Sequence, residues 1–105
     1  MNGLICSGGS NGSKVNVSAT GAMILAYNRH YKYIRISNLS NTYVTIMPNP
    51  SEDGECPVEF GKGIVLAPKG TPGWFIEFNN NNMFYSDFWA ITETGNADLA
   101  ILAGY

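Results

Sequence analysis

The residues of this chain that could perform chemistry are few and lie far apart in the sequence. Its one histidine is His30, and its two cysteines are Cys6 and Cys56. Nucleophilic catalysis requires a nucleophile, a base and an orienting group within hydrogen-bond reach of one another. The residues that flank these three form no motif of that kind, and their spacing is not that of a zinc site. The sequence therefore predicts no catalytic residue and no metal ligand among them.

The acidic residues indicate no catalytic centre either. Glu52, Asp53 and Glu55 surround a glycine turn whose oxygens could bind Ca²⁺, but their spacing is not that of an EF-hand loop, so we interpret the segment as a solvated turn. Glu59 and Glu77 could be nominated as a glycosidase pair, although any β protein offers two such carboxylates. No phosphate-binding loop, dinucleotide fingerprint or nucleophile elbow is present. We predict a protein that is not an enzyme and has no cofactor.

Charged side chains are scarce in this sequence. They make up 13% of the 105 residues, against about 25% in an average globular protein, while the apolar fraction of 45% is ordinary. The net charge of −2 excludes the basic face on which a nucleic-acid-binding protein depends. No apolar run approaches the length of a membrane-spanning helix. We therefore expect neither nucleic acid nor membrane among the partners of the chain.

The N-terminal residues have the composition of a flexible arm. Residues 1–6 contain no apolar region long enough for a secretory signal, so we expect free thiols at Cys6 and Cys56 rather than a disulfide. Residues 7–13 consist of Ser, Gly and Asn, which is typical of a flexible linker. We predict an arm over 1–13 and a single domain over 14–105.

The rest of the chain has the pattern of short β-strands. Apolar residues alternate with polar ones or form short runs, and turn residues separate these segments at intervals of about ten residues. Three prolines within 48–57 prevent that segment from forming a central strand. We predict an all-β, single-domain antiparallel β-sandwich or barrel of about eight short strands. The expected strands cover 14–19, 22–27, 31–37, 42–47, 64–66, 74–78, 88–91 and 99–103.

Two of these segments alternate most clearly. They cover 31–37 and 42–47, and the turn between them is rich in Asn and Ser, whose side chains can bond their own backbone. The two segments therefore predict a β-hairpin. The faces they predict are Ile34 with Ile36 opposite Tyr33 with Arg35, and Val44 with Ile46 opposite Tyr43, Thr45 and Met47.

Aromatic side chains crowd the region between residues 74 and 89. Because side chains alternate along a strand, Trp74 and Phe75 cannot both point into the core, and neither can Phe88 and Trp89. A cluster of exposed rings suggests a binding surface, for stacking on sugars or for packing against a neighbouring subunit. The alternative is that these rings only fill the core and the loops. The candidate interaction surface consists of Tyr43, Trp74, Phe75, Asn80, Asn81, Tyr85 and Trp89.

The order of short motifs along the chain resembles that of small β-structured accessory proteins of tailed-phage virions. The motifs are YIRISNLSN at 33–41, VTI at 44–46, GIVLAP at 63–68, WFIEF at 74–78, FWAIT at 88–92 and ADLAI at 97–101. The resemblance covers 31–103 and implies a hairpin corner, not an active site, at Ile36, Asn38 and Ser40. The proline-rich segment 48–57 is longer than the usual link in such proteins. The resemblance implies a virion structural protein, such as a head decoration, a head fibre base, or a neck or tail component.

Two hypotheses about function follow. In the first, the chain is a non-enzymatic virion structural protein, made in the host cytoplasm, that forms a homo-oligomer and docks on the major capsid protein or another virion protein. In the second, it is a carbohydrate-binding β-sandwich whose partner is a glycan. Its exposed Trp74 or Trp89 would then stack on sugar rings beside the asparagines of 79–82. The scarcity of charge fits the first hypothesis, because charged residues are depleted at the centres of protein interfaces. Faces rich in Asn and Thr also suit sugar binding.

Overall fold

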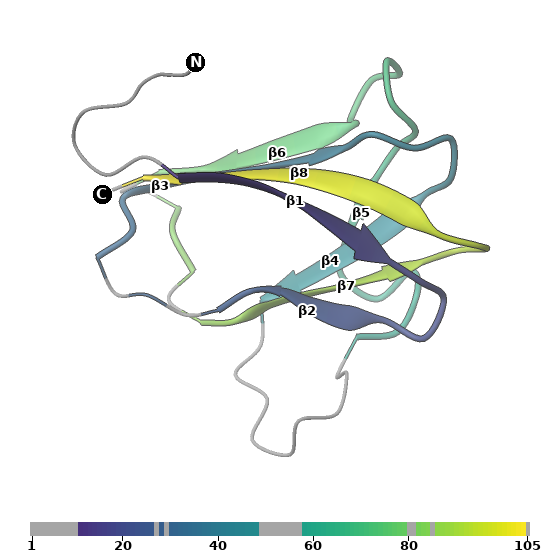
Figure 1. The fold of residues 1–105 in the computed structure, drawn as a ribbon, viewed down its shortest axis with the longest axis horizontal. Helices are drawn as coiled ribbons and strands as arrows, with labels where there is room; N and C mark the ends of the chain where they lie inside the picture. Colours follow the sequence, from purple (N-terminus) through teal and green to yellow (C-terminus); the bar gives the residue numbers. More distant parts are fainter. Residues whose placement is uncertain are drawn as a thin grey trace.

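The chain folds as two four-stranded β-sheets packed face to face (Figure 1). The computed structural model describes residues 11–26, 28, 30–48, 58–79, 82–84 and 86–104. None of these residues forms an α-helix, so the described part of the chain has no helix that could cross a membrane. The strands are β1 (Asn11–Val17), β2 (Ala22–Leu25), β3 (Tyr33–Asn38), β4 (Val44–Pro48), β5 (Ile64–Leu66), β6 (Phe75–Phe78), β7 (Phe88–Thr92) and β8 (Ala97–Gly104). The predicted all-β sandwich is confirmed.

Alternation along the strands builds the core between the sheets. Every second residue points inward, and the aliphatic ones become almost completely buried, which stabilises the fold by about 1.5–3 kcal/mol per side chain. In β8 the inward residues are Ala97, Leu99, Ile101 and Ala103, and in β3 they begin with Ile34. From the facing sheet, the core receives Ile24, Val44, Ile46, Leu66, Phe88 and Ala90. The predicted grouping of Ile34 with Ile36, and of Val44 with Ile46, on one face of each strand is thus confirmed.

The connections carry the chain back and forth between the two sheets. One sheet has the order β1-β8-β3-β6 and the other β2-β7-β4-β5, and every strand pair is antiparallel. Consecutive strands lie in different sheets, with β4 and β5 as the exception. Eight strands in two sheets connected in this way form a jelly roll.

The predicted hairpin of the third and fourth strands is wrong. β3 pairs with β6 and β8, whereas β4 pairs with β5 and β7 in the opposite sheet. The turn between them is therefore a corner at which the chain passes from one sheet to the other (Figure 1). The resemblance to virion proteins implied a corner at Ile36, Asn38 and Ser40, and a corner is what the structure has, though not one within a hairpin.

A fully buried amide holds this corner. The Asn38 side chain donates from Nδ2 to the carbonyl oxygens of Thr42 (2.7 Å) and Ala67 (2.9 Å). Its Oδ1 accepts from the backbone N–H of Ser40 (3.0 Å) and from the Ser40 hydroxyl (2.7 Å). The backbone N–H of Asn38 donates to the carbonyl of Trp74 at 2.8 Å. One residue thus joins the end of β3, the turn that follows it, the segment after β5 and the segment before β6.

The strand boundaries differ from the expected ones mainly at the start of the chain. β1 begins at Asn11, three residues before the expected strand, so residues 11–13 lie in the sheet. Residues 1–10 of the predicted arm, with Cys6, lie outside the described residues. Residues 49–57, with Cys56 and the carboxylates considered for Ca²⁺, also lie outside the described residues. Pro48 is the last residue of β4.

Replacing Asn38 tests the importance of the corner. Asn38→Ala should lower the free energy of unfolding by about 3 kcal/mol, because it removes the hydrogen bonds to the carbonyls of Thr42 and Ala67 and takes the acceptor from the N–H of Ser40. Asn38→Asp should cost more at neutral pH, since a carboxylate would then face the same two carbonyl oxygens. Burial and the two carbonyl oxygens that face one carboxylate oxygen would raise the pKa of this carboxyl in the folded state, so the extra loss should disappear as the pH falls below about 4.

Urea unfolding of both variants over a range of pH measures these effects. The control is Asn16→Ala, an exposed asparagine on β1 that should change the free energy of unfolding by less than about 0.5 kcal/mol. Losses of similar small size in all three variants would show that the corner does not depend on the buried amide.

Candidate interaction surface

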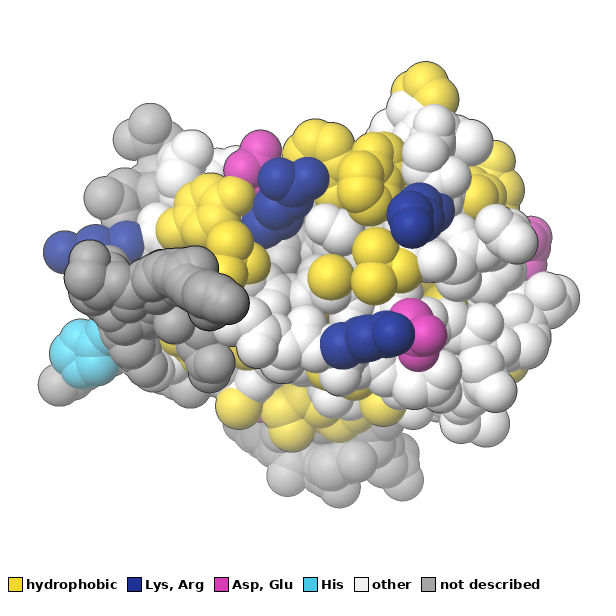
Figure 2. All heavy atoms as spheres, turned by 45° about the horizontal axis from the view of Figure 1, so that its top comes forward, with side chains coloured by type: hydrophobic (Ala, Val, Ile, Leu, Met, Phe, Trp, Pro, Cys, Tyr) yellow, Lys and Arg dark blue, Asp and Glu magenta, His cyan; other side chains and the backbone are white. Residues whose placement is uncertain are grey.

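The outer face of the β1-β8-β3-β6 sheet gathers most of the side chains that could meet a partner. They are the residues at alternate positions to those in the core, and cross-strand register places them in rows across the sheet. Figure 2 shows this side of the molecule, where hydrophobic side chains lie among a few charged ones. The outward residues are Gly12, Lys14 and Asn16 of β1, Asp98, Ala100 and Leu102 of β8, Tyr33, Arg35 and Ser37 of β3, and Phe75 and Glu77 of β6.

An aromatic pair lies at one side of this face. Phe75 opposes Ser37 of β3 and is 37% exposed. The guanidinium of Arg35 lies 4.3 Å from the centroid of the Phe75 ring, a cation–π contact worth about 0.5–1 kcal/mol at an exposed site. The Trp74 ring meets Phe75 edge to face, with centroids 5.5 Å apart and planes at 77°. These contacts hold the Phe75 ring in one orientation at the surface.

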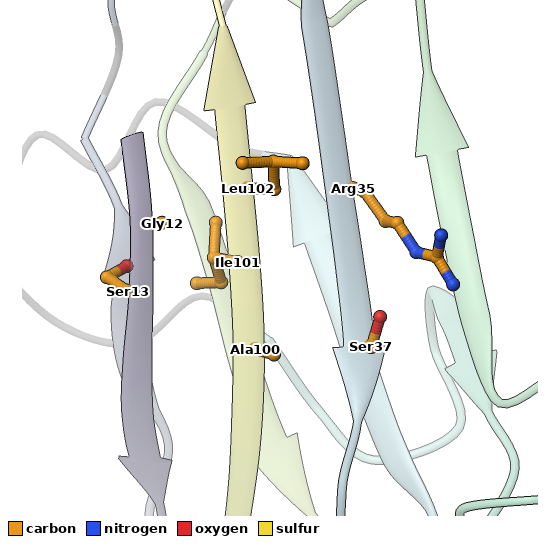
Figure 3. Close-up of a pocket in the computed structure, with 7 residues that line it drawn as sticks. All are labelled: Gly12, Ser13, Arg35, Ser37, Ala100, Ile101 and Leu102. Carbon is orange, nitrogen blue, oxygen red and sulfur yellow. The ribbon is translucent and has the colours of Figure 1, made fainter. Parts of the chain in front are cut away.

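A shallow hollow of about 360 Å³ lies next to the aromatic pair. Its floor is low because Gly12, Ala100 and Ser37 have small side chains, and Leu102, which is 41% exposed, stands at its rim (Figure 3). Figure 3 also shows the side chain of Arg35, which lines the hollow, reaching from β3 toward β6. The face therefore combines an exposed Leu, an exposed Phe and a depression between β1 and β3. This shape suits packing against another protein.

The charges on this face are each engaged by a neighbour in the same chain. Glu77 lies opposite Arg35 in register, yet it accepts a hydrogen bond from the Tyr33 hydroxyl, while Arg35 covers Phe75. That hydrogen bond is the main reason why the pKa of Tyr33 is raised above its usual 10.0, and burial adds to the shift. On the same face, at the β1 edge, Lys14 Nζ lies 3.7 Å from Asp98 Oδ2. Asn16 donates to Asp98 Oδ1 at 3.0 Å.

Of the predicted surface residues that the structure describes, two come together, and Tyr43 and Trp89 do not join them. Trp74 and Phe75 form the aromatic pair. Tyr43 is 45% exposed but belongs to the segment before β4, in the opposite sheet, where its carbonyl accepts from the N–H of Glu93. Outside the described residues lie Asn80, Asn81 and Tyr85.

Trp89 is not an exposed ring. It alternates with Phe88 and Ala90, which are in the core, and it lies opposite Met23 and Met47 on the outer face of the other sheet. The alternation argument is therefore correct, since Phe88 and Trp89 do not share a face. The further expectation that the outward ring is exposed is wrong, because Trp89 is only 5% exposed. Its indole N–H has no acceptor among the described residues.

Sequence reasoning missed Leu102, although it placed Arg35 and Tyr33 on a common face. Leu102 stands in a run of apolar residues, so its composition does not distinguish it from its buried neighbours. Alternation along the strand could have identified Leu102, because its side chain must point to the face opposite that of Leu99, Ile101 and Ala103. Glu77 was considered only as one half of a glycosidase pair.

The described residues offer little for catalysis. In the ranges that the structure describes, no three side chains of His, Cys, Asp and Glu come together as a metal-binding group. His30 is exposed, and its backbone N–H donates to the side chain of Asn28 at 2.9 Å. Glu59 forms an exposed ion pair with Lys62 at 2.8 Å, whereas Glu77 bonds Tyr33. The outer face can pack against another molecule and form hydrogen bonds with it, which suits binding.

Comparisons with known proteins identify no family. No protein-family model matches the chain, and no curated protein matches it. A solved structure described in the words "Bacillus endospore appendages form a novel family of disulfide-linked pili" is similar over 99% of this chain and 98% of that chain. The identity is 20% and the TM-score is 0.44. At these values the likeness assigns neither a family nor a function to the chain.

The bond between Tyr33 and Glu77 makes a testable prediction about alkaline titration. Because the carboxylate of Glu77 accepts the hydroxyl proton, Tyr33 should lose it at a higher pH than an unperturbed tyrosine does. A folded-state pKa above the unfolded value means that this contribution to stability is complete below pH 10.0 and is lost as the pH rises through the folded pKa. The difference in tyrosinate absorbance between the wild type and Tyr33→Phe isolates this residue. The same difference in a Glu77→Gln background should move to lower pH, and an unchanged midpoint would contradict the assigned cause.

Proposed function

We propose that the chain is a non-enzymatic structural protein that self-associates and packs the outer face of its β1-β8-β3-β6 sheet against neighbouring proteins. The observation that carries the proposal is the exposure of Phe75 and Leu102 on one sheet face, beside Trp74 and Arg35. Clustered exposed apolar side chains mark interaction sites, and Trp and Arg are enriched among the residues that dominate binding energy. The sequence resemblance supports the virion of a tailed phage as the setting, with a capsid or other virion protein as the neighbour.

The local pairing of charges supports burial of this face. Taking an isolated charge out of water is costly, whereas a charge that already has a partner brings that partner with it. Lys14 has Asp98, Glu77 has Tyr33, and Arg35 has the face of Phe75. A neighbouring protein could therefore cover the face while each of these charged groups keeps a favourable contact within its own chain. The small fraction of charged residues in the chain, 13%, also supports burial of this face, because charged residues are depleted at the centres of interfaces.

Carbohydrate binding is the second candidate, and the aromatic pair is the observation that favours it. Trp74 and Phe75 could stack on sugar rings while Arg35 and Glu77 bond their hydroxyls. The contribution expected from Trp89 is absent, because that ring is buried. In the asparagine turn, Asn82 Oδ1 accepts from the backbone N–H of Asn79 at 2.7 Å, so its side chain serves the turn. These two facts favour protein packing over sugar binding.

Light scattering at several protein concentrations tests the proposal. The wild type should have a mass above the 11.4 kDa of one chain and should dissociate on dilution. Leu102→Glu places a charge at the rim of the hollow and should weaken association at least about tenfold, as removal of a central interface residue does. Thr94→Glu, in the exposed turn between β7 and β8, is the matched control and should change nothing.

A monomeric wild type at all concentrations would contradict the structural function. If that monomer also bound a polysaccharide, and Trp74→Ala abolished the binding, the carbohydrate-binding function would replace it. An oligomer that Leu102→Glu and Thr94→Glu leave equally intact would show that the outer face is not part of the contact.

A further inference from the structure

The four edge strands of the sandwich differ in their capacity to pair with another chain. β6 and β2 have four residues each and β5 has three, and the register of β2 shifts between Met23 and Leu25. Short and irregular edges are the devices by which proteins prevent edge-to-edge pairing. β1 has seven residues and pairs with β8 without interruption from Asn11 to Val17. It is the long, regular edge of this molecule (Figure 1).

β1 is also weakly protected by its side chains. It contains no proline, and its single charged residue is Lys14. A lysine protects an edge when its charge remains at that edge. The Lys14 ammonium instead lies 3.7 Å from the Asp98 carboxylate on β8, toward the middle of the sheet. Within the described chain β1 has β8 as its only strand partner, so its other side presents backbone donors and acceptors.

We propose that β1 pairs antiparallel with β1 of a second copy of this chain, across a two-fold axis at Val15. The proposal rests on the self-association proposed above and adds to the outer face a second contact, at the edge of the same sheet. A second copy is the occupant because an antiparallel pair of identical strands is self-complementary, as a two-fold interface requires. The pairing joins the β1-β8-β3-β6 sheets of two copies into one continuous sheet.

Charge selects the register of this pairing. With the axis at Lys14, two ammonium groups oppose each other directly, which is unfavourable. With the axis at Ser13, each Lys14 opposes Gly12 of the second copy. With the axis at Val15, each Lys14 opposes Asn16 of the second copy, and the Asp98 bonded to that asparagine lies next in the same row. Each lysine then lies between two carboxylates, one from each copy.

The core side of β1 agrees with the same register. Val15 is partly buried and packs against the core cluster. With the axis at Val15, the two Val15 side chains lie directly opposite each other, about 4.5–5.5 Å apart at their Cβ atoms. Their contact extends the core of each copy across the interface, and it covers the apolar side chain that the free edge leaves half-exposed.

Single cysteines test the register directly, in a chain whose native thiols are removed by Cys6→Ser and Cys56→Ser. Val15→Cys should form an intermolecular disulfide on mild oxidation, because opposed Cα atoms are about 4.5–5.5 Å apart and a disulfide spans about 4.4–6.8 Å. Ser13→Cys should not, because in this register its two copies are displaced by four residues, about 13 Å along the strand. The product at twice the mass is measured on a non-reducing gel.

A charge reversal tests the same interface without new covalent chemistry. Lys14→Glu places a carboxylate beside Asp98 of the second copy at two symmetric positions, so the dissociation constant should rise about tenfold. Lys62→Glu is the matched control, since it also breaks an exposed ion pair and changes the charge equally, but far from β1. Adding Asp98→Lys to Lys14→Glu should restore association. Sedimentation equilibrium of the four chains gives the dissociation constants.

The outcomes separate this inference from the proposed function. A wild type that is monomeric overturns both. An oligomeric wild type in which Val15→Cys does not crosslink, or in which Ser13→Cys crosslinks faster, overturns the β1 contact and leaves association through the outer face standing. Equal effects of Lys14→Glu and Lys62→Glu overturn it as well. Crosslinking at residue 15 with selective weakening by Lys14→Glu supports it.

Discussion

The buried side chain of Asn38 is the constraint on which the arrangement of this molecule depends. β3 and β4 would pair as a hairpin if the turn between them closed on itself, but the Asn38 amide binds the turn at Thr42 and the segment after β5 at Ala67. The chain is thereby directed into the opposite sheet. The Asn38 N–H also holds the carbonyl of Trp74, immediately before β6. The aromatic pair lies beside Arg35 because that same contact aligns β6 with β3.

β3 then determines what the two sides of its sheet can do. Its inward residues, Ile34 and Ile36, are fully buried in the core. Its outward residues, Tyr33 and Arg35, engage Glu77 and Phe75 of β6. A strand at the middle of a sheet is held on both sides, so side chains that it presents outward are held in place more firmly than those on a loop. This explains how Arg35 and Glu77, on a face with few charges, each keep a defined neighbour.

Alternation along the chain is enough to predict the fold class, the strand positions and most of their faces, because burial of every second residue is a local property. Strand pairing is not local. The predicted hairpin between β3 and β4 is wrong because pairing also depends on distant contacts: one of the four hydrogen bonds of the Asn38 amide goes to the carbonyl of Ala67, 29 residues away. The predicted exposure of the Trp89 ring is wrong for a related reason, since alternation predicts the direction of a side chain but not what covers it. The sequence argument did predict a surface ring at Trp74 or Phe75, because consecutive side chains of a strand point to opposite faces and only one of them can enter the core.

The outer face and the β1 edge are neighbours, and their closeness has a consequence for assembly. Leu102 lies opposite Gly12 of β1, so the hollow and its rim adjoin the edge at which a second copy would pair. Pairing along β1 places the outer faces of both copies on the same side of one sheet. A partner with repeated sites would then meet two patches at a fixed spacing, and two linked contacts bind far more tightly than one. Two copies of the outer face, held at that spacing, would therefore bind such a partner more tightly than either face alone.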